Sequence, residues 1–271
     1  MKLISKFLFV FIFSIIAISF NNIQVNAADN NDINDTENEK IIDAKLLEYG
    51  YPERLVNELS YLAKKEMIDE GITEYVSAET ITYDQNNKII AVDDYNDPNP
   101  EPQMVPFGTI NSMKVTITAG RQVVPSYIDE FILQSEFQWT ISPVVRGTDL
   151  IGFAWDGNKF NAMPNTSKVV VGGNGGNGAA TYSSNNLYAS SFTGVGWSFP
   201  LPSSGTRPIA VSKIRIKEVK SALTGSSQFH SLYTHTHSGT GTIGLNFGVL
   251  TVAFAGTKPN DQRASFVNFN H

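Results

Sequence analysis

From Phe107 to the C-terminus, apolar and polar residues alternate along the chain in the manner of an antiparallel β protein. Runs with a period of two residues, which is the spacing of side chains on one face of a strand, follow one another between clusters of glycine, proline or asparagine. These runs are 109–119, 130–142, 149–155, 167–171, 180–199 and 209–219. No helical pattern separates them. We therefore expect residues 107–271 to form an antiparallel β-sandwich or jelly roll.

The clearest alternation is in Phe229–Gly256, which predicts a β-hairpin with a glycine-containing turn in its middle. Two registers fit this turn. A two-residue loop places His235 and His237 on a solvent face, whereas a three-residue loop buries them in the core. We favour the buried register, because Tyr233 then shares a face with the apolar residues of the second strand. After Val249 the apolar residues move to the other set of alternating positions, starting at Leu250. This change predicts a bulge or bend near Gly248.

The chain before the β region follows a different pattern. Residues 28–40 are rich in Asp and Asn with almost nothing apolar, and are expected to be disordered. Residues 41–96 predict a small helical hairpin with an apolar stripe, followed by a short β-hairpin. Residues 97–106 contain proline at close intervals and predict a stiff linker, which we take as the domain boundary.

The N-terminus has the pattern of a secretory signal peptide over residues 1–27. Lys2 and Lys6 precede the apolar run Phe7–Phe20, and small residues near its end predict a cleavage site after Ala27. An uncleaved membrane anchor is the alternative, but the run is shorter than the ~20 residues that span a bilayer. We expect a secreted, extracellular mature chain without a transmembrane segment.

The composition adds to this picture. The chain contains no cysteine, which excludes disulfides and a lipid-bearing cysteine. Together with the short, apolar signal that begins with lysines, this suggests export by a Gram-positive bacterium. Charge is unevenly distributed: residues 28–101 hold nineteen acidic and six basic residues, whereas residues 102–271 hold seven acidic and twelve basic residues. Opposite charges on the two parts suggest that the acidic part lies against the β region and masks a basic face.

A candidate basic face is visible in the run from Lys213 to Lys217. Alternation places Lys213, Arg215 and Lys217 on one strand face and two isoleucines on the other. The simpler interpretation is the solvated side of a strand that charge protects from edge pairing. The more specific one is an anion-binding site for an anionic wall polymer or membrane surface. Nucleic acid is disfavoured, because no aromatic residues alternate with the cations.

The sequence contains few residue patterns that are typical of metal, cofactor or catalytic sites. His235 and His237 could supply two metal ligands, but a metal site needs three or four, so a packed histidine pair is favoured. Gly173–Gly178 matches a phosphate-binding glycine pattern, but no helix is predicted after it, and we expect no cofactor. No catalytic motif is found and no catalytic residue is predicted. The three tryptophans are expected to anchor the core rather than to stack on sugars: Trp139, Trp155 and Trp197.

Three segments, 49–59, 137–143 and 148–155, read YGYPERLVNEL, FQWTISP and TDLIGFAW. In these segments the chain resembles uncharacterised exported proteins of Gram-positive bacilli. The resemblance implies secretion and an extra-cytoplasmic β domain, and it transfers no functional residue.

Three function hypotheses follow. The first is a secreted, non-enzymatic β-sandwich that binds a cell-surface or wall partner and is masked by its acidic N-terminal region. The second is a pore-forming or membrane-damaging toxin with a removable pro-segment, because stretches such as Thr234–Thr242 and Tyr182–Ser191 alternate and are rich in Ser and Thr. The third is a glycan-binding module or a hydrolase.

Overall fold

The computed structural model describes most of the chain from Asp32 onward. The described residues are 32–97, 111–123, 129–143, 146–173, 179–187, 189–191, 193–202, 207–220, 224–236, 242–246, 251–255 and 260–271. The expected signal peptide and nearly all of the expected linker lie outside these ranges, as does His237.

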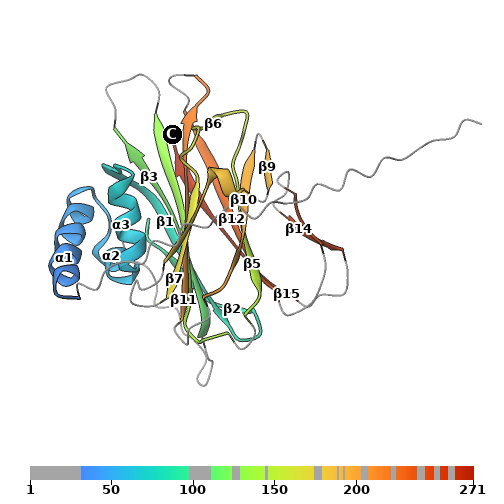
Figure 1. Cartoon of the computed structure of the whole chain (residues 1–271). Helices are drawn as coiled ribbons and strands as arrows, with labels where there is room; N and C mark the ends of the chain where they lie inside the picture. The colour runs from blue at the N-terminus through green and yellow to red at the C-terminus, as the bar shows by residue number, and fades with distance from the viewer. Residues whose placement is uncertain are drawn as a thin grey trace, which may run out of the picture.

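Two antiparallel sheets pack face to face, which confirms the β-sandwich (Figure 1). Sheet A has the order β2 (Ile89–Asp94), β1 (Glu74–Asp84), β3 (Asn111–Gln122), β4 (Glu130–Trp139), β11 (Pro208–Glu218), β7 (Lys168–Gly173), β8 (Ala180–Ser183), with β6 (Phe160–Ala162) also paired to β11. Sheet B has the order β15 (Asn260–Asn270), β12 (Ser226–Thr236), β5 (Thr148–Ala154), β10 (Gly194–Pro200), β9 (Ala189–Ser191). A separate ribbon pairs β13 (Thr242–Asn246) with β14 (Thr251–Ala255).

The main core lies between the sheets and is rich in aromatic residues. Phe137 stacks on Tyr233 at 4.9 Å between ring centroids, and Phe153 meets Trp197 edge to face at 5.8 Å. All three tryptophans are buried, as predicted. They are therefore closed to stacking on a sugar, which removes one of the features behind the glycan-binding hypothesis.

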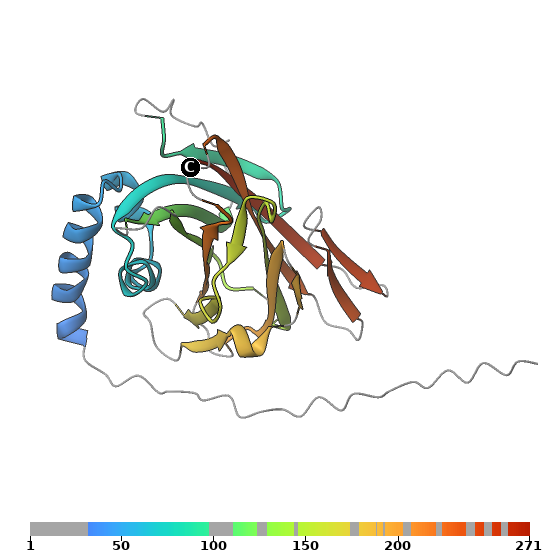
Figure 2. The ribbon, with the colours of Figure 1, turned by 90° about the horizontal axis from the view of Figure 1, so that it is seen from above.

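Three helices cover the outer face of sheet A (Figures 1 and 2). They are α1 (Asp32–Glu48), α2 (Glu53–Glu58) and α3 (Tyr61–Asp69); a short 3-10 helix, η1 (Ser184–Asn186), follows β8. The chain leaves α1 through Gly50 and leaves α3 through Gly71, both of which have positive φ. The Ser60 side chain accepts a hydrogen bond from Ala63 N–H and so caps α3. The expected helical hairpin is present.

The expectation of disorder up to residue 40 is corrected by α1, which begins at Asp32. Lys64 of α3 explains why this polar segment is ordered. Its Nζ lies 2.8 Å from Glu39 and 2.8 Å from Asp43 of α1. The ammonium is buried, and these two carboxylates offset the cost of removing it from water. Composition alone does not reveal a partner that lies in another helix.

The domain boundary expected at residues 97–106 is also corrected. The hairpin of β1 and β2, which we had grouped with the N-terminal region, belongs to sheet A. Strand β1 pairs with β3 from Glu74↔Arg121 to Asp84↔Asn111, across the whole length of the strand. The sandwich therefore starts before the prolines, and in the described residues 32–97 the helices α1–α3 are the elements that lie outside its sheets.

The hairpin expected over Phe229–Gly256 does not form. Strand β12 pairs with β15 on one side and with β5 on the other, and β13 pairs with β14. The expected burial of Tyr233 and His235 is confirmed, but β12 is buried by strands distant in sequence and not by a hairpin partner. The phase change that predicted a bulge near Gly248 separates β13 from β14; Gly248 itself lies outside the described residues.

Glu79 of β1 yields a prediction about pH. It lies opposite Asp94 of β2. Burial, together with the charge of Asp94, raises the pKa of Glu79 to about 7, from an ordinary value of 4.5. The folded state then holds a proton that the unfolded state releases, so the free energy of unfolding falls as pH rises through this interval. Because the side chain is partly exposed, we expect Glu79→Gln to raise that free energy by only ~1 kcal/mol above about pH 8.

Below about pH 4 the same substitution should have little effect, because Glu79 is then protonated in both states. Urea unfolding at the two pH values measures the difference. The exposed Glu48→Gln makes the same change in charge and should stay within ~0.5 kcal/mol at both. An equal effect of Glu79→Gln at both pH values would show that the carboxyl ionises normally.

Candidate functional site

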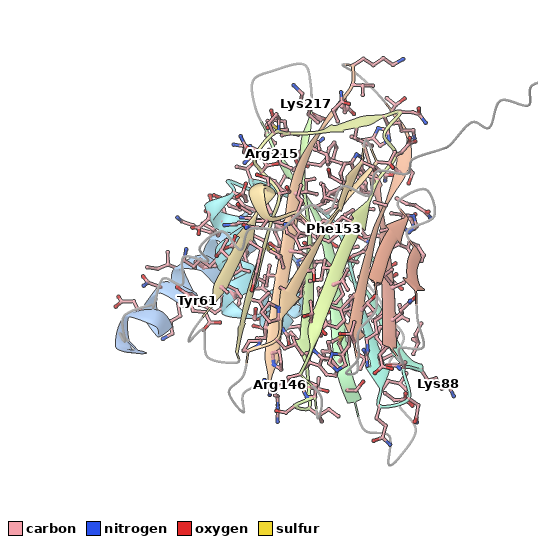
Figure 3. The ribbon with its side chains drawn as sticks, turned by 45° about the vertical axis from the view of Figure 1, so that its right-hand side comes forward. Tyr61, Lys88, Arg146, Phe153, Arg215 and Lys217 are labelled. Carbon is pink, nitrogen blue, oxygen red and sulfur yellow. The ribbon has the colours of Figure 1, made fainter. Side chains whose placement is uncertain are left out.

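The basic face predicted on β11 is present, and its alternation is as expected. Ile214 and Ile216 point into the core between the sheets. Lys213, Arg215 and Lys217 occupy the opposite face of sheet A, where the helices lie. Figure 3 shows Arg215 and Lys217 on this strand. The three cations differ in their surroundings, however, and only Lys217 is exposed.

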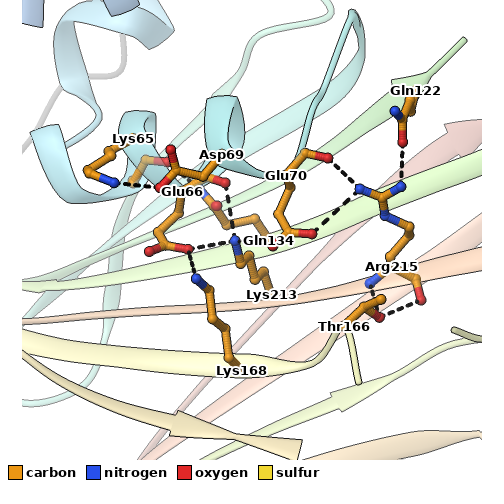
Figure 4. A network of polar contacts seen from close by, with 11 residues as sticks. Lys65, Glu66, Asp69, Glu70, Gln122, Gln134, Thr166, Lys168, Lys213 and Arg215 are labelled. Carbon is orange, nitrogen blue, oxygen red and sulfur yellow. Dashed lines mark hydrogen bonds and ion pairs between the residues drawn. The ribbon is translucent and has the colours of Figure 1, made fainter. Parts of the chain in front are cut away.

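Helix α3 covers Lys213 with two carboxylates (Figure 4). The Lys213 Nζ lies 2.6 Å from Glu66 Oε2 and 2.6 Å from Glu70 Oε1, and it donates a hydrogen bond to the carbonyl oxygen of Glu66 at 3.2 Å. The side chain of Lys213 is 1% exposed. Burial lowers the pKa of Lys213, while the carboxylates of Glu66 and Glu70 oppose that change. In this state Lys213 cannot reach an external anion.

Arg215 is also covered, though less completely. Its guanidinium lies 3.2 Å from Glu130 Oε2 and 3.6 Å from Glu70 Oε2, and it donates hydrogen bonds to the Gln122 side chain and to the carbonyl oxygen of Glu70. Glu70 and its carbonyl belong to the helical layer. The Arg215 guanidinium is therefore covered partly by the acidic helical layer and partly by side chains of sheet A.

The sequence analysis missed a fourth cation, Lys168 of β7. Lys168 is the register partner of Lys213, and its Nζ lies 2.7 Å from Glu66 Oε2, so Glu66 bridges two lysines (Figure 4). Burial lowers the pKa of Lys168, but the hydrogen bond and charge of Glu66 outweigh this and leave the pKa raised. The four-residue spacing of Glu66 and Glu70 places them on one helical face, so their joint role could have been predicted from the sequence. The pairing of Lys168 with Lys213 could not, because it depends on the order of strands in the sheet.

The contact between helices and sheet also has an apolar part. Leu55, Leu59, Ala63 and Met67 are buried together with Ile132, Val211 and other residues of sheet A. Polar groups of the sheet lie beside them. The backbone N–H of Ser60 is 3.3 Å from both carboxyl oxygens of Glu136, and burial raises the pKa of Glu136. The helices thus cover a sheet face that mixes apolar residues with carboxylates, lysines and amides.

His235 belongs to a buried polar cluster inside the sandwich. Its Nδ1 lies 2.9 Å from Asp149 Oδ1, and Asp149 also accepts hydrogen bonds from the Tyr233 hydroxyl and, at 3.2 Å, from the Thr236 N–H. Asp149 is 0% exposed and His235 2% exposed. His235 is thus packed inside the sandwich, as expected, whereas His237, the other member of the expected pair, lies outside the described residues. No group of three or more His, Asp or Glu side chains that could hold a metal ion is found in the described part of the chain.

Among the described residues, no helix is both long enough and apolar enough to cross a bilayer. Neither a protein-family model nor a curated protein matches the chain.

Solved structures show distant likeness to this chain. One is the collagen-binding domain from a Staphylococcus aureus adhesin, with 11% identity, a TM-score of 0.30 and coverage of 54% of this chain and 95% of that domain. Another is Clostridium perfringens delta-toxin, with 9% identity, a TM-score of 0.31 and coverage of 72% and 88%. A third is the S. aureus collagen adhesin, with 7% identity, a TM-score of 0.28 and coverage of 74% and 85%. Likeness at this level carries no argument about function.

Proposed function

We propose that this chain is an exported, non-enzymatic binding protein whose β-sandwich takes an anionic partner at a cell surface or wall. The binding face is the helix-facing side of sheet A, around Lys168, Lys213 and Arg215, and α1–α3 mask it. The observation that supports the proposal is the cover over Lys213, in which two carboxylates of α3 lie 2.6 Å from a lysine that is 1% exposed.

The carboxylates of α3 occupy the positions that an anionic partner would take. Lys213 and Arg215 are two residues apart on one strand, a separation of ~6.6 Å, and Lys168 lies on the neighbouring strand ~4.8 Å away. Phosphates or carboxylates of a repeating polymer can therefore meet several cations at once. The acidic excess of the N-terminal region serves as an internal substitute for such a polymer.

Removal of the mask has an energetic cost, which the apolar contacts of Leu55, Leu59 and Met67 largely determine. Buried ion pairs add little net stability, because the desolvation of both partners offsets their attraction. A competing polyanion acts on the ionic part of the contact only. Binding is therefore expected to be weak in the intact chain and to strengthen when an α3 carboxylate is removed.

We test the proposal with Glu66→Gln, using Asp69→Asn as the matched control. Both substitutions remove one carboxylate from α3, but Asp69 pairs with Lys65 on the exposed side of the helix. Binding to purified poly(glycerol phosphate) teichoic acid is measured by titration at low and at high salt. We expect Glu66→Gln to bind about tenfold more tightly than the unaltered chain, and Asp69→Asn to bind like the unaltered chain.

High salt should abolish the gain, because the contact is electrostatic. Equal affinities of the two variants, or binding that ignores salt, would contradict the proposal. Circular dichroism confirms that both variants are folded before they are compared.

A further inference from the structure

Four segments that are distant in the sequence meet at the end of the sandwich where β12 begins. Strand β12 starts at Ser226 and β15 ends at Asn270, and these two residues are register partners. The end of β11 and the turn between β5 and β6 lie at the same end, because Val219 N–H donates a hydrogen bond to the carbonyl oxygen of Lys159 at 2.8 Å. Figure 1 shows the C-terminus beside β6. Each of the four segments contributes one polar side chain to a cluster.

His271 is held in this cluster by both its backbone and its ring. Its N–H donates to the carbonyl oxygen of Gly225 at 3.0 Å, and its carbonyl oxygen accepts from the N–H of Gly225 at 3.1 Å. Its ring meets Phe160 of β6 edge to face at 5.1 Å between ring centroids. The side chain is 0% exposed. The imidazole therefore has one defined position among its neighbours.

The two ring nitrogens of His271 face two different groups. Nε2 lies 3.0 Å from the hydroxyl oxygen of Ser227, and Nδ1 lies 3.5 Å from Oε1 of Glu218, whose side chain is 2% exposed. The second distance is that of an ion pair and is long for a hydrogen bond. A hydroxyl, an imidazole and a carboxylate in this order form the arrangement in which a base activates a nucleophile and a third group orients the base. The three residues come from three different strands, so no local motif predicts them.

Lys159 determines the direction of the hydrogen bond between Ser227 and His271. Its Nζ lies 3.2 Å from the Ser227 hydroxyl oxygen and 3.0 Å from the carbonyl oxygen of Ser226. An ammonium group only donates, so the hydroxyl oxygen accepts from Lys159 and directs its own proton to Nε2 of His271. His271 then carries its proton on Nδ1, toward the Glu218 carboxylate. The ammonium also stabilises negative charge that develops on the serine oxygen.

We propose that Ser227 is a nucleophile that takes an acyl group from a carboxylic ester. The Ser227 oxygen attacks the carbonyl carbon of the ester while Nε2 of His271 accepts the hydroxyl proton. The bond from that carbon to the alkoxy oxygen then breaks, and the alcohol leaves with the proton from His271. The products are one alcohol and one ester of Ser227, with no change in oxidation state. Glu218 is a positioning residue, because it acts through His271.

The acyl group stays on the protein. Ser227 is 7% exposed and the side chain of His271 is 0% exposed, so an ester at Ser227 lies between solvent and Nε2 and hinders the water that would hydrolyse it. The reaction is therefore stoichiometric, with one acyl group per chain, and gives a protein that acts without turnover a covalent mode of attachment. It is independent of the anion binding proposed for sheet A, which uses Lys168, Lys213 and Arg215.

The probe for this reaction is p-nitrophenyl acetate, because its acyl group is small and its alcohol is coloured. We expect a burst of about one equivalent of p-nitrophenol per chain and one acetyl group on Ser227, located by tandem mass spectrometry. Ser227→Ala should abolish both. Ser226→Ala is the matched control, since Ser226 is the exposed neighbour on the opposite face of β12, and it should react like the unaltered chain.

Two further variants test the base and the residue that positions it. His271→Ala should lower the rate of acetylation by at least about 100-fold, and added imidazole should restore part of that rate. Glu218→Gln should lower the rate by at least about tenfold when His271 is present. In the His271→Ala background it should have no further effect, because it acts through the imidazole. A merely structural Glu218 would lower the rate in both backgrounds.

The proposal is overturned if the unaltered chain is not acetylated, or if Ser227→Ala is acetylated to the same extent. It is also overturned if imidazole restores no rate to a His271→Ala variant that circular dichroism shows to be folded. Release of p-nitrophenol far beyond one equivalent would make the chain a hydrolase and would contradict a stoichiometric reaction. A single burst that requires both Ser227 and His271 supports the proposal.

Discussion

Replacing Lys213 by alanine is expected to lower the free energy of unfolding by about 3 kcal/mol, because it leaves two carboxylates of α3 facing a buried sheet surface without their shared cation. The loss is at the lower end of the range for a broken buried pair. Lys168 still contacts Glu66, and Arg215 still contacts Glu70. Urea unfolding followed by circular dichroism measures the effect.

Lys217→Ala is the matched control for this experiment. Lys217 lies on the same strand and the same face, but it is exposed, so its loss should change the free energy of unfolding by less than ~0.5 kcal/mol. Lys213→Met, which keeps most of the side-chain volume, should be as destabilising as alanine if the missing charge is the cause. If Lys213→Ala and Lys217→Ala behave alike, the cover over β11 is not a stabilising contact.

Asp149→Ala is the second substitution with a large expected effect, about 4 kcal/mol of unfolding free energy. Asp149 is 0% exposed and accepts hydrogen bonds from Tyr233, His235 and the backbone N–H of Thr236. Alanine removes the carboxylate that accepts these three hydrogen bonds inside the sandwich. The desolvation of the donors is then no longer offset by these bonds, and a cavity is added at the same place.

Asp149→Asn separates the loss of charge from the loss of the acceptors. The amide oxygen still accepts hydrogen bonds, so the expected loss is only ~1–2 kcal/mol. Asp156→Ala serves as the surface control. Asp156 accepts one hydrogen bond, from Asn158 N–H in an exposed turn, and its replacement should cost ~1 kcal/mol or less. An Asp149→Ala variant as stable as Asp149→Asn would show that the cluster around His235 contributes little to folding.

Some features of this protein followed from the sequence alone. The alternation in β11 correctly assigned Ile214 and Ile216 to the core and Lys213, Arg215 and Lys217 to the other face. The class of fold and the presence of an N-terminal helical hairpin were also predicted. These are properties of local geometry, since the period of two in a strand and the apolar stripe of a helix depend on residues close together in the chain.

The pairing of strands was decided by the tertiary structure. Phe229–Gly256 alternates as a hairpin would, yet β12 pairs with β5 and β15. Backbone hydrogen bonds are the same for every residue, so a strand's partner is selected by the packing of the whole sandwich and not by the nearest turn signal. The same holds for the proline-rich segment 97–106, because the strands before and after it, β2 and β3, belong to one sheet and not to two domains.

The environment of the basic residues could likewise not be predicted from the sequence. Lys213, Arg215 and Lys217 are equivalent as a pattern, but only the first is buried by α3, through a contact with Glu66 that is 147 residues distant in the chain. The sequence determined that a negative part and a positive part exist. Which charges meet was determined only when the helices docked on sheet A, because Coulomb energy depends on separation in space and on burial.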